Sequence, residues 1–386
     1  MSRIRQLRLA KGMSLDRLVA AMDGVVTKQA LSKYERGLSR PGPVIAARLA
    51  SALGVRTLQL WQPPAIAMEI VGYRRLSGLG KKECAQIETT IFSDLEKRCR
   101  LQERLGTVPD LSALVQSCSV TSVADAENCA QILRWRLQLG QGPIANLHAV
   151  LNANYVHTIS IHTERRFDGL CAVARNPRGR AVAAALTSRD GLPGDRQRMN
   201  LSHELGHLFM QPQDDEIDEA AAFRFAGAFL VPREALVRAL GERRTNIQVS
   251  ELIALKRQFK VSIAALLYRL RDLEIISPTY YTSWMIELGR RGWRTNEPEA
   301  IPSETSDWLT QMTTRALSEG LITRDEAREF DRNMPDDVLA AATSTQAEFL
   351  KLPRAARQQR LAAAAAALQS HYDERLEDLE TGLEDE

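Results

Sequence analysis

Apolar residues recur at helical spacing over most of this chain. Residues 1–55 alternate short amphipathic runs with Gly and Pro, which predicts four or five short helices. Longer helical patterns predict helices at 81–106, 123–139, 199–210, 215–230, 233–241, 247–259 and 262–274. Residues 277–300, which contain Pro278 and Pro298, are predicted to be irregular, and helical spacing then returns at 305–320, 324–332 and 353–380.

A different pattern occupies the middle of the chain. Three runs rich in Val, Ile, Ala or Thr are bounded by Asp-Gly or Asn-Pro-Arg-Gly turns, and they predict strands at 155–162, 169–174 and 181–187. A few strands among many helices predict a fold that is mainly α with a small β-sheet, in the α+β class.

Length and composition narrow the class of protein. At 386 residues the chain suits two or three domains, and no stretch reaches the roughly 18 apolar residues of a membrane helix. The N-terminus shows no secretory apolar region, so we expect a cytoplasmic protein without a membrane partner. Five Cys residues without a CxxC pair are predicted to be reduced, mostly buried thiols, neither disulfides nor zinc ligands.

Charge is unevenly distributed, although the net charge is only +3. Residues 1–60 hold eleven Lys or Arg residues and three acidic ones, a balance of +8, which suits contact with a phosphate backbone. Residues 373–386 hold one Arg and eight acidic residues, a balance of −7. This acidic end would repel DNA, and it predicts either a solvated tail or contact with a basic partner.

The basic head has the layout of a helix-turn-helix domain. Ser14 is placed to cap one helix, Gly24 to end it, and Thr27 to cap a second helix that Gly37 ends. The exposed face of the second helix would present the DNA-binding candidates Thr27, Lys28, Gln29, Ser32 and Lys33. Gln can pair with adenine, while Lys and Ser can reach base edges or phosphates. A small helical bundle used for protein contacts is the alternative.

The end of this second helix carries a more specific motif, Ser32-Lys33-Tyr34-Glu35-Arg36-Gly37. It resembles the end of the recognition helix in Xre-type, lambda-repressor-like domains. Asp16-Arg17 departs from that family, which often has a polar pair including Gln at this place. The resemblance implies an N-terminal lambda-repressor-like helical domain that binds operator DNA. The oligomeric state, a homodimer included, stays open.

A candidate metal site lies on the predicted helix 199–210. The motif His203-Glu204-Leu205-Gly206-His207 places two imidazoles at i and i+4, within ~6 Å on one face, where both can bind one Zn2+ ion. Glu204 would then lie beside the metal and act as general base toward a water molecule whose pKa zinc lowers to about 7. The alternative is a chance occurrence of two His and a Glu on an exposed helix.

A third protein ligand is expected from the next helix. Glu219 lies twelve residues after His207 and precedes three Ala residues, which would let the two helices approach closely. Glu216, one turn earlier, is the rival ligand, and Asp215 and Asp218 are less favoured. Two His, one Glu and an open fourth position form a catalytic zinc arrangement.

Other polar residues near this region have competing interpretations. Arg198, before the metal motif, could polarise a substrate carbonyl or form a structural ion pair. His148 and His157 lie in apolar or strand-like surroundings, which favours a structural role for each.

The metal motif belongs to a wider pattern, whose members are Arg198–Phe209, Glu219, Ala222, Phe225, Ala226 and Phe229–Pro232. The stretch 196–232 thereby resembles the ImmA/IrrE family of metallopeptidases. Phe223 departs from the family, which usually has Asn there, and this change would weaken the orientation of a zinc ligand. The resemblance implies a zincin-like, gluzincin-type endopeptidase domain that cleaves a regulatory protein, often a DNA-bound repressor.

The predicted C-terminal helix leaves a second function open. Residues 352–386 begin with Leu-Pro-x-x-x-Arg and contain His-Tyr followed by acidic residues. They are similar to the toxin-binding arms of some bacterial antitoxins. This resemblance implies an antitoxin that represses its own operon and neutralises a nuclease toxin, with the peptidase fold mainly as scaffold. A helix packed on its own domain is the plainer alternative.

Together these patterns predict five segments and one main function. The segments are a helix-turn-helix domain (1–60), a helical linker region (61–122), a zinc metallopeptidase domain (123–276), a C-terminal helical extension (277–335), and an amphipathic helix with an acidic tail (336–386) that could bind a partner. The expected function is a DNA-binding transcriptional regulator with a zinc-dependent endopeptidase domain.

Overall fold

The computed structural model describes most of the chain up to residue 336. The described residues are 3–61, 65–71, 80–163, 167, 169–332, 334–336, 339, 353, 356 and 358–359. Two compact units divide the chain, Met1–Trp308 and Leu309–Glu386. The predicted C-terminal arm, with its similarity to antitoxins, lies almost entirely outside the described residues, so it stays a prediction.

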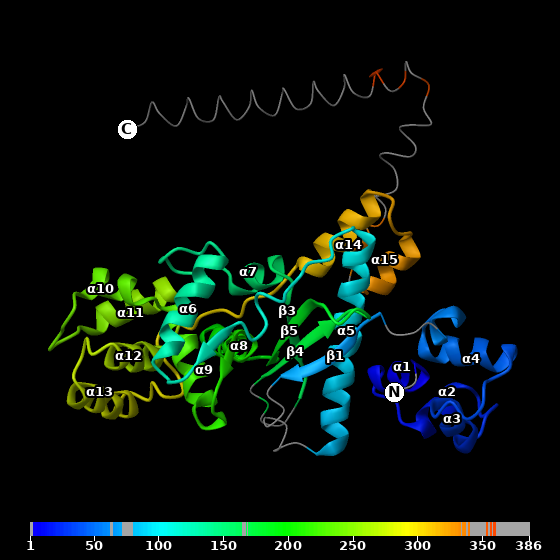
Figure 1. The fold of residues 1–386 in the computed structure, drawn as a ribbon, viewed down its shortest axis with the longest axis horizontal. Helices are drawn as coiled ribbons and strands as arrows, with labels where there is room; N and C mark the ends of the chain where they lie inside the picture. Colours follow the sequence, from blue (N-terminus) through cyan, green and yellow to red (C-terminus); the bar gives the residue numbers. More distant parts are fainter. Residues whose placement is uncertain are drawn as a thin grey trace. The chain divides into compact units, whose positions relative to one another are not determined.

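The head of the chain is a small helical domain, as predicted. Its elements are α1 (Arg3–Ala10), α2 (Leu15–Ala21), α3 (Lys28–Glu35), α4 (Pro43–Leu53) and the short 3-10 helix η1 (Thr57–Leu60) (Figure 1). Ser14 and Thr27 cap α2 and α3 through their side-chain oxygens, which confirms both predicted caps. Leu18, Leu31 and Leu49 are fully buried in its core.

A buried ion pair braces this head. The guanidinium of Arg8 on α1 donates to both carboxylate oxygens of Glu35, at 2.6 and 2.9 Å, and Glu35 ends α3. A bidentate pair has a fixed geometry, so it holds the end of α3 against α1.

The sheet at the centre of the first unit has four strands in the order β1-β4-β5-β3. They are β1 (Ala67–Val71), β3 (Val156–Ile161), β4 (Leu170–Arg175) and β5 (Ala181–Arg189). β1, β4 and β5 are antiparallel, whereas β3 pairs parallel with β5. The three predicted strands are confirmed. The fourth, β1, comes from the region that was expected to be a helical linker.

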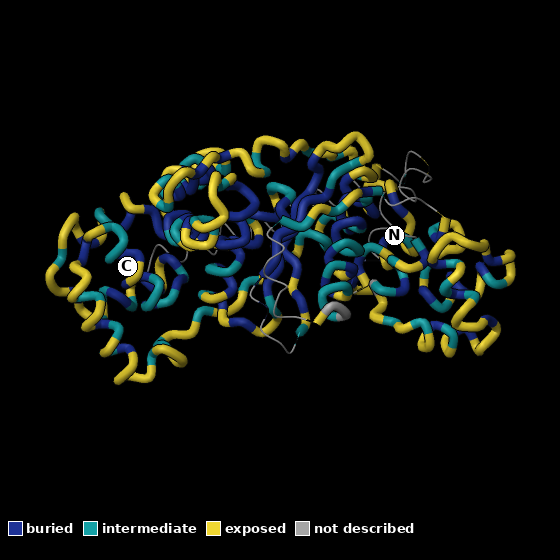
Figure 2. The backbone as a smooth tube through the Cα atoms, turned by 60° about the horizontal axis from the view of Figure 1, so that its bottom comes forward, coloured by how far each residue is buried: buried dark blue, intermediate teal, exposed yellow. Residues whose placement is uncertain are grey.

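Helices cover both faces of this sheet. β4 and β5 are buried along nearly their whole length, and the buried stretch is visible in Figure 2. On one face Ala172, Ala174 and Ala185 pack with Ile91 and Leu95 of α5 (Lys81–Arg104). On the other face the alternate strand residues join a core that includes Leu201 and Leu205 of α8 (Gly194–Phe209).

The largest core gathers helices around α8. These are α6 (Asp125–Arg136), α7 (Leu147–Ala153), α9 (Asp215–Leu230), α10 (Arg233–Leu240), α11 (Val249–Phe259), α12 (Ile263–Asp272) and α13 (Pro278–Arg290). The short strands β2 (Cys118–Val120) and β6 (Met210–Pro212) pair in parallel, and β6 joins α8 to α9. The fold is therefore mainly helical with a small mixed sheet, as the sequence predicts. Among the described residues, no helix has the length and apolarity needed to span a membrane.

Two predictions about this region are wrong. Residues 277–300 were expected to be irregular, but Pro278–Arg290 forms α13. The side chain of Ser277 caps this helix, and Pro278 occupies its first turn, where a missing N–H costs nothing. The Pro that suggested an irregular stretch thus marks a helix start.

The second correction concerns the cysteines. Cys118 on β2 and Cys129 on α6 form a disulfide, whereas Cys84, Cys99 and Cys171 are free thiols. The two bonded cysteines are 11 positions apart in the sequence, and tertiary packing of β2 beside α6 brings them together. Cys99 behaves as predicted for a buried thiol, because burial raises its pKa to about 12.

The described part of the second unit contains two helices. α14 (Trp308–Ser318) begins at the last residue of the first unit, and α15 (Arg324–Phe330) follows it. Thr310 donates to the carboxylate of Asp331 at 2.6 Å, which ties the end of α15 to α14. Both helices lie where the sequence predicts them.

Candidate metal centre

α8 presents the two histidines of the metal motif to the next helix. Its apolar residues Leu201, Leu205 and Leu208 are fully buried, so the helix is fixed in the core. His203 and His207 are one turn apart and also buried. A Cβ atom on Gly206 would lie 3.1 Å from Phe225 and 3.3 Å from the backbone of Ala222. The glycine therefore lets α9 approach α8 closely.

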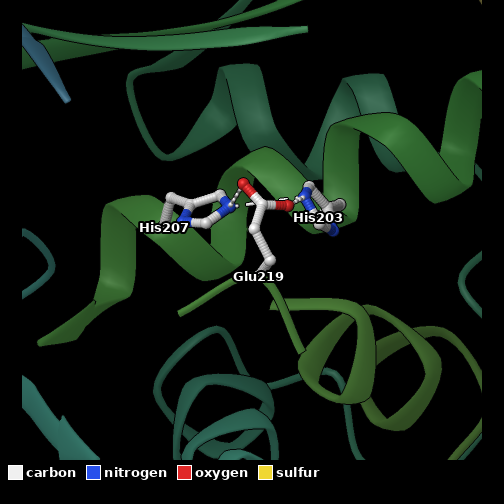
Figure 3. Close-up of side chains that lie close together, drawn as sticks. All are labelled: His203, His207 and Glu219. Atoms are coloured by element: carbon white, nitrogen blue, oxygen red, sulfur yellow. Dashed lines mark hydrogen bonds and ion pairs between the residues drawn. The ribbon is translucent and has the colours of Figure 1, made fainter. Parts of the chain in front are cut away.

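This close approach brings Glu219 of α9 to both imidazoles (Figure 3). The Nε2 atoms of His203 and His207 are 3.3 Å apart. One carboxylate oxygen of Glu219 lies 3.4 Å from Nε2 of His203, and the other lies 3.9 Å from Nε2 of His207. Among the described residues, these three form the one group of His, Cys, Asp and Glu side chains with metal-binding spacing, and it includes Glu219 rather than the rival Glu216.

These distances can be tested against a zinc ion. Ligand atoms at about 2.0–2.1 Å from a tetrahedral zinc are separated by about 3.3–3.4 Å. The separation of the two Nε2 atoms and that of Oε2 of Glu219 from Nε2 of His203 agree with this value. Oε1, the other oxygen of Glu219, lies about half an ångström farther from Nε2 of His207. Two neutral imidazoles and one carboxylate are also the ligand types that zinc prefers. The residues fit a zinc ion.

The side chain of Glu204 extends from α8 to Gly169, the residue before β4. This side chain is buried, and Glu204 follows His203 directly on α8. A Cβ atom on Gly169 would lie 2.8 Å from both Cγ and Oε1 of Glu204, and 2.9 Å from the carbonyl oxygen of Thr187. The residue before β4 must therefore be glycine for the carboxylate to keep this place.

Two family models match the chain. Residues 4–60 match the helix-turn-helix model, and residues 186–271 match Peptidase_M78, the IrrE N-terminal-like domain. The chain carries an IrrE N-terminal-like peptidase domain. No curated protein matches the chain.

Within the IrrE N-terminal-like domain, Asp218 has a place that the sequence did not suggest. Its carboxylate oxygen lies 2.9 Å from Nδ1 of His207 and accepts a hydrogen bond from that atom. A carboxylate on the outer nitrogen of a ligand histidine fixes the ring and leaves Nε2 as the metal-facing atom. Sequence reasoning ranked Asp218 only as a poor ligand. Its position next to the candidate ligand Glu219 is the feature of the sequence that could have indicated a role in supporting the site.

Phe223 is the residue at which the sequence is predicted to depart from the ImmA/IrrE family. Its ring contacts the imidazole of His203, with ring centroids 4.2 Å apart and planes tilted by 53°. The residue is nevertheless 55% exposed. Phe223 therefore places an apolar surface beside His203.

Arg198 and the two buried histidines lie outside this centre. Arg198 is fully buried, pairs with Glu304 at 2.5 Å and donates to the carbonyl oxygen of Ile144 at 3.0 Å. This is the structural ion pair that the sequence left open. His148 bonds to Thr158, and His157 bonds to Asn152, which supports the structural role expected for both. Burial lowers the pKa of each imidazole.

The five residues predicted to contact DNA lie on α3 or at its N-cap. Thr27, Lys28, Gln29 and Lys33 are exposed, and Ser32 is partly buried. Two of them have partners within the domain, because Thr27 caps α3 and the Lys28 ammonium lies 2.7 Å from Asp16. Gln29 and Lys33 thus remain the strongest candidates for base and phosphate contacts.

Proposed function

We propose that this protein is a zinc-dependent endopeptidase that acts on a protein and is directed or regulated by its DNA-binding head. One observation carries the proposal. His203 and His207 of α8 converge with Glu219 of α9 at spacings that suit a zinc ion, and Glu204 follows His203 directly on α8. A carboxylate at that position is what peptide hydrolysis needs, and a purely structural metal site does not need it.

Each residue of the centre has a separate role in the proposed hydrolysis. His203, His207 and Glu219 would hold the zinc ion, which when bound polarises the scissile carbonyl and lowers the pKa of water. Glu204 takes the proton of the attacking water and then delivers it to the nitrogen of the leaving amine. Asp218 orients His207 from behind. Gly169 keeps the space into which the Glu204 side chain fits.

The DNA-binding head supports a regulatory protein as the substrate. In the proposed arrangement, Gln29 and Lys33 contact operator DNA from the exposed face of α3. Binding at an operator would raise the local concentration of the peptidase near other DNA-bound proteins. A DNA-bound repressor is thus the substrate class that best fits both domains.

An antitoxin is the second candidate function. The observation that favours it is the acidic end of the sequence, where residues 373–386 hold eight acidic residues and one Arg. Such a segment could cover the basic site of a nuclease toxin. The two functions are compatible, since an antitoxin can also be a peptidase.

Glu204→Gln tests the enzymatic proposal. The amide keeps the size of the side chain but cannot accept the proton, so we expect retained zinc and loss of cleavage. Wild type and variant would be incubated with protein extract of the source cells, and new protein N-termini would be identified by mass spectrometry. Glu216→Gln, on the exposed side of α9, is the matched control and should cleave like wild type. Equal cleavage by Glu204→Gln and wild type would contradict the proposal.

A further inference from the structure

The surface beside the metal centre contains one exposed aromatic ring. Phe223 is 55% exposed, and its ring rests against the imidazole of His203 at 4.2 Å. In the described part of the matched peptidase stretch 186–271, only Phe223 and Tyr268 are large apolar residues with this degree of exposure. Ligand sites are lined largely by apolar and aromatic side chains, so an exposed ring beside a candidate active site is placed to contact a ligand.

The centre opens to solvent on the side of this ring. The side chain of Glu219 is 60% exposed, whereas those of His203 and His207 are only 8% and 3% exposed. Phe223 follows Glu219 by four residues on α9, so both project from the same face of that helix. A polypeptide that reaches the metal from solvent would therefore pass along Phe223.

A role of Phe223 in supporting His203 does not by itself explain why Phe223 is exposed. Phe225 and Phe229, on the same helix, stack on one another and are fully buried, as expected for rings that serve packing. The ring of Phe223 contacts His203, and the residue as a whole is still 55% exposed to solvent. That free surface is available to a ligand.

We propose that Phe223 is a specificity-determining contact for the substrate residue next to the scissile bond, and that it selects an apolar, preferably aromatic, side chain there. The inference rests on the proposed peptidase function. An aromatic side chain seated on Phe223 would bury apolar surface of both groups and pair the two rings. An Asn at this position would provide no such surface.

The role of Phe223 can be tested by the binding of hydroxamates, which bind zinc, so that no peptide cleavage has to be measured. The probes are a peptide hydroxamate with a benzyl side chain next to its zinc-binding group, and the glycine analogue that lacks the side chain. Affinities would be measured by calorimetry on the zinc-loaded full-length protein. Wild type should favour the benzyl compound by about fivefold to tenfold, the usual value of one aromatic pair. Phe223→Asn should reduce this preference to within about twofold.

Control variants separate specificity from support of the metal site. Phe223→Leu keeps an apolar surface and should keep part of the preference. Tyr268→Ala removes an exposed ring that contacts Arg271 and Tyr281. This variant should keep the full preference for the benzyl compound. Zinc affinity would be measured for each variant by competition with a chelator. It should be unchanged in all of them if Phe223 acts on the substrate.

The outcomes are distinguishable. A benzyl preference that survives Phe223→Asn overturns the inference, and so does an equal loss of affinity for zinc and for both hydroxamates. The proposed function would stand in either case. If the glycine analogue fails to bind zinc-loaded wild type, the metal-centred function fails, and the role of Phe223 fails with it.

Discussion

Nδ1 of His207 lies 2.9 Å from a carboxylate oxygen of Asp218, the residue that directly precedes Glu219. Consecutive residues of α9 thus approach the metal centre in two ways. Glu219 reaches the inner nitrogens of the two imidazoles, and Asp218 holds the outer nitrogen of His207. Because one turn of helix supplies both groups, a small shift of α9 would affect the ligand and its support together.

Asp218→Ala should weaken zinc binding by about 10- to 100-fold, because the ring of His207 loses its orienting acceptor. Competition with a fluorescent chelator would measure the affinity, and circular dichroism would check the fold. Asp215→Ala, an exposed residue at the start of the same helix, is the matched control. Equal zinc affinity of Asp218→Ala and wild type would show that the hydrogen bond does not orient the ligand.

Gly169→Ala should displace the Glu204 carboxylate. The added methyl group would lie 2.8 Å from the Glu204 side chain and 2.9 Å from the backbone oxygen of Thr187, which cannot move freely. We expect loss of cleavage with zinc retained, and a free energy of unfolding lower by about 1–3 kcal/mol. Gly142→Ala is the control, because a Cβ atom there meets no atom within 4 Å. The prediction is wrong if Gly169→Ala cleaves as well as wild type.

Gln29→Ala together with Lys33→Ala should abolish specific DNA binding without unfolding the head. Both side chains are exposed on α3, and one good base contact is worth about 1–3 kcal/mol. The measurement is a shift assay at fixed salt, with DNA selected from a random pool by the wild-type protein. Lys28→Ala should have a smaller effect, since Lys28 already pairs with Asp16. Undiminished binding by the double variant would exclude α3 as the recognition helix.

His157 should make the folded protein less stable in mild acid. Burial, with Arg98 nearby, lowers the pKa of this fully buried imidazole well below its usual range. Above about pH 6.5 the imidazole is neutral in both states, so its titration does not change the free energy of unfolding there. As the pH falls below about 6.5, the unfolded chain binds a proton that the folded state rejects. Stability then falls by up to about 1.4 kcal/mol per pH unit.

Urea unfolding between about pH 7 and about pH 5 would measure this slope. His157→Phe should flatten it, and the slope that remains includes the contribution of His148, whose pKa burial also lowers. His162→Phe is the control, because the His162 side chain is 92% exposed. An unchanged slope in His157→Phe would mean that this imidazole is not the group that titrates.

Much of the candidate site could be predicted because its signals are local. The spacing of His203 and His207 needs only a helix to bring two imidazoles to one face. The caps at Ser14 and Thr27 likewise depend on residues three positions away. Glu219 could be ranked above Glu216 from the small residues that follow it, and the distances in the metal cluster agree with that choice.

Features that depend on distant contacts could not be predicted in this way. The sequence contains no pairing signal for β1, which becomes a strand because β4 offers it an edge. The disulfide between Cys118 and Cys129 requires β2 to pack beside α6, so the expectation of free thiols was wrong. Pro278 was interpreted as a break, although Ser277 and the first turn of α13 accommodate it.

The sequence by itself determined the two chemical motifs of this protein, a capped recognition helix and a helix with two imidazoles and a carboxylate, because each is set by spacing along one helix. The tertiary structure decided what surrounds them. Gly169 against Glu204, Asp218 behind His207 and the exposed ring of Phe223 on His203 all depend on how α8, α9 and the sheet pack. Such contacts arise only when buried apolar faces fix the elements against one another.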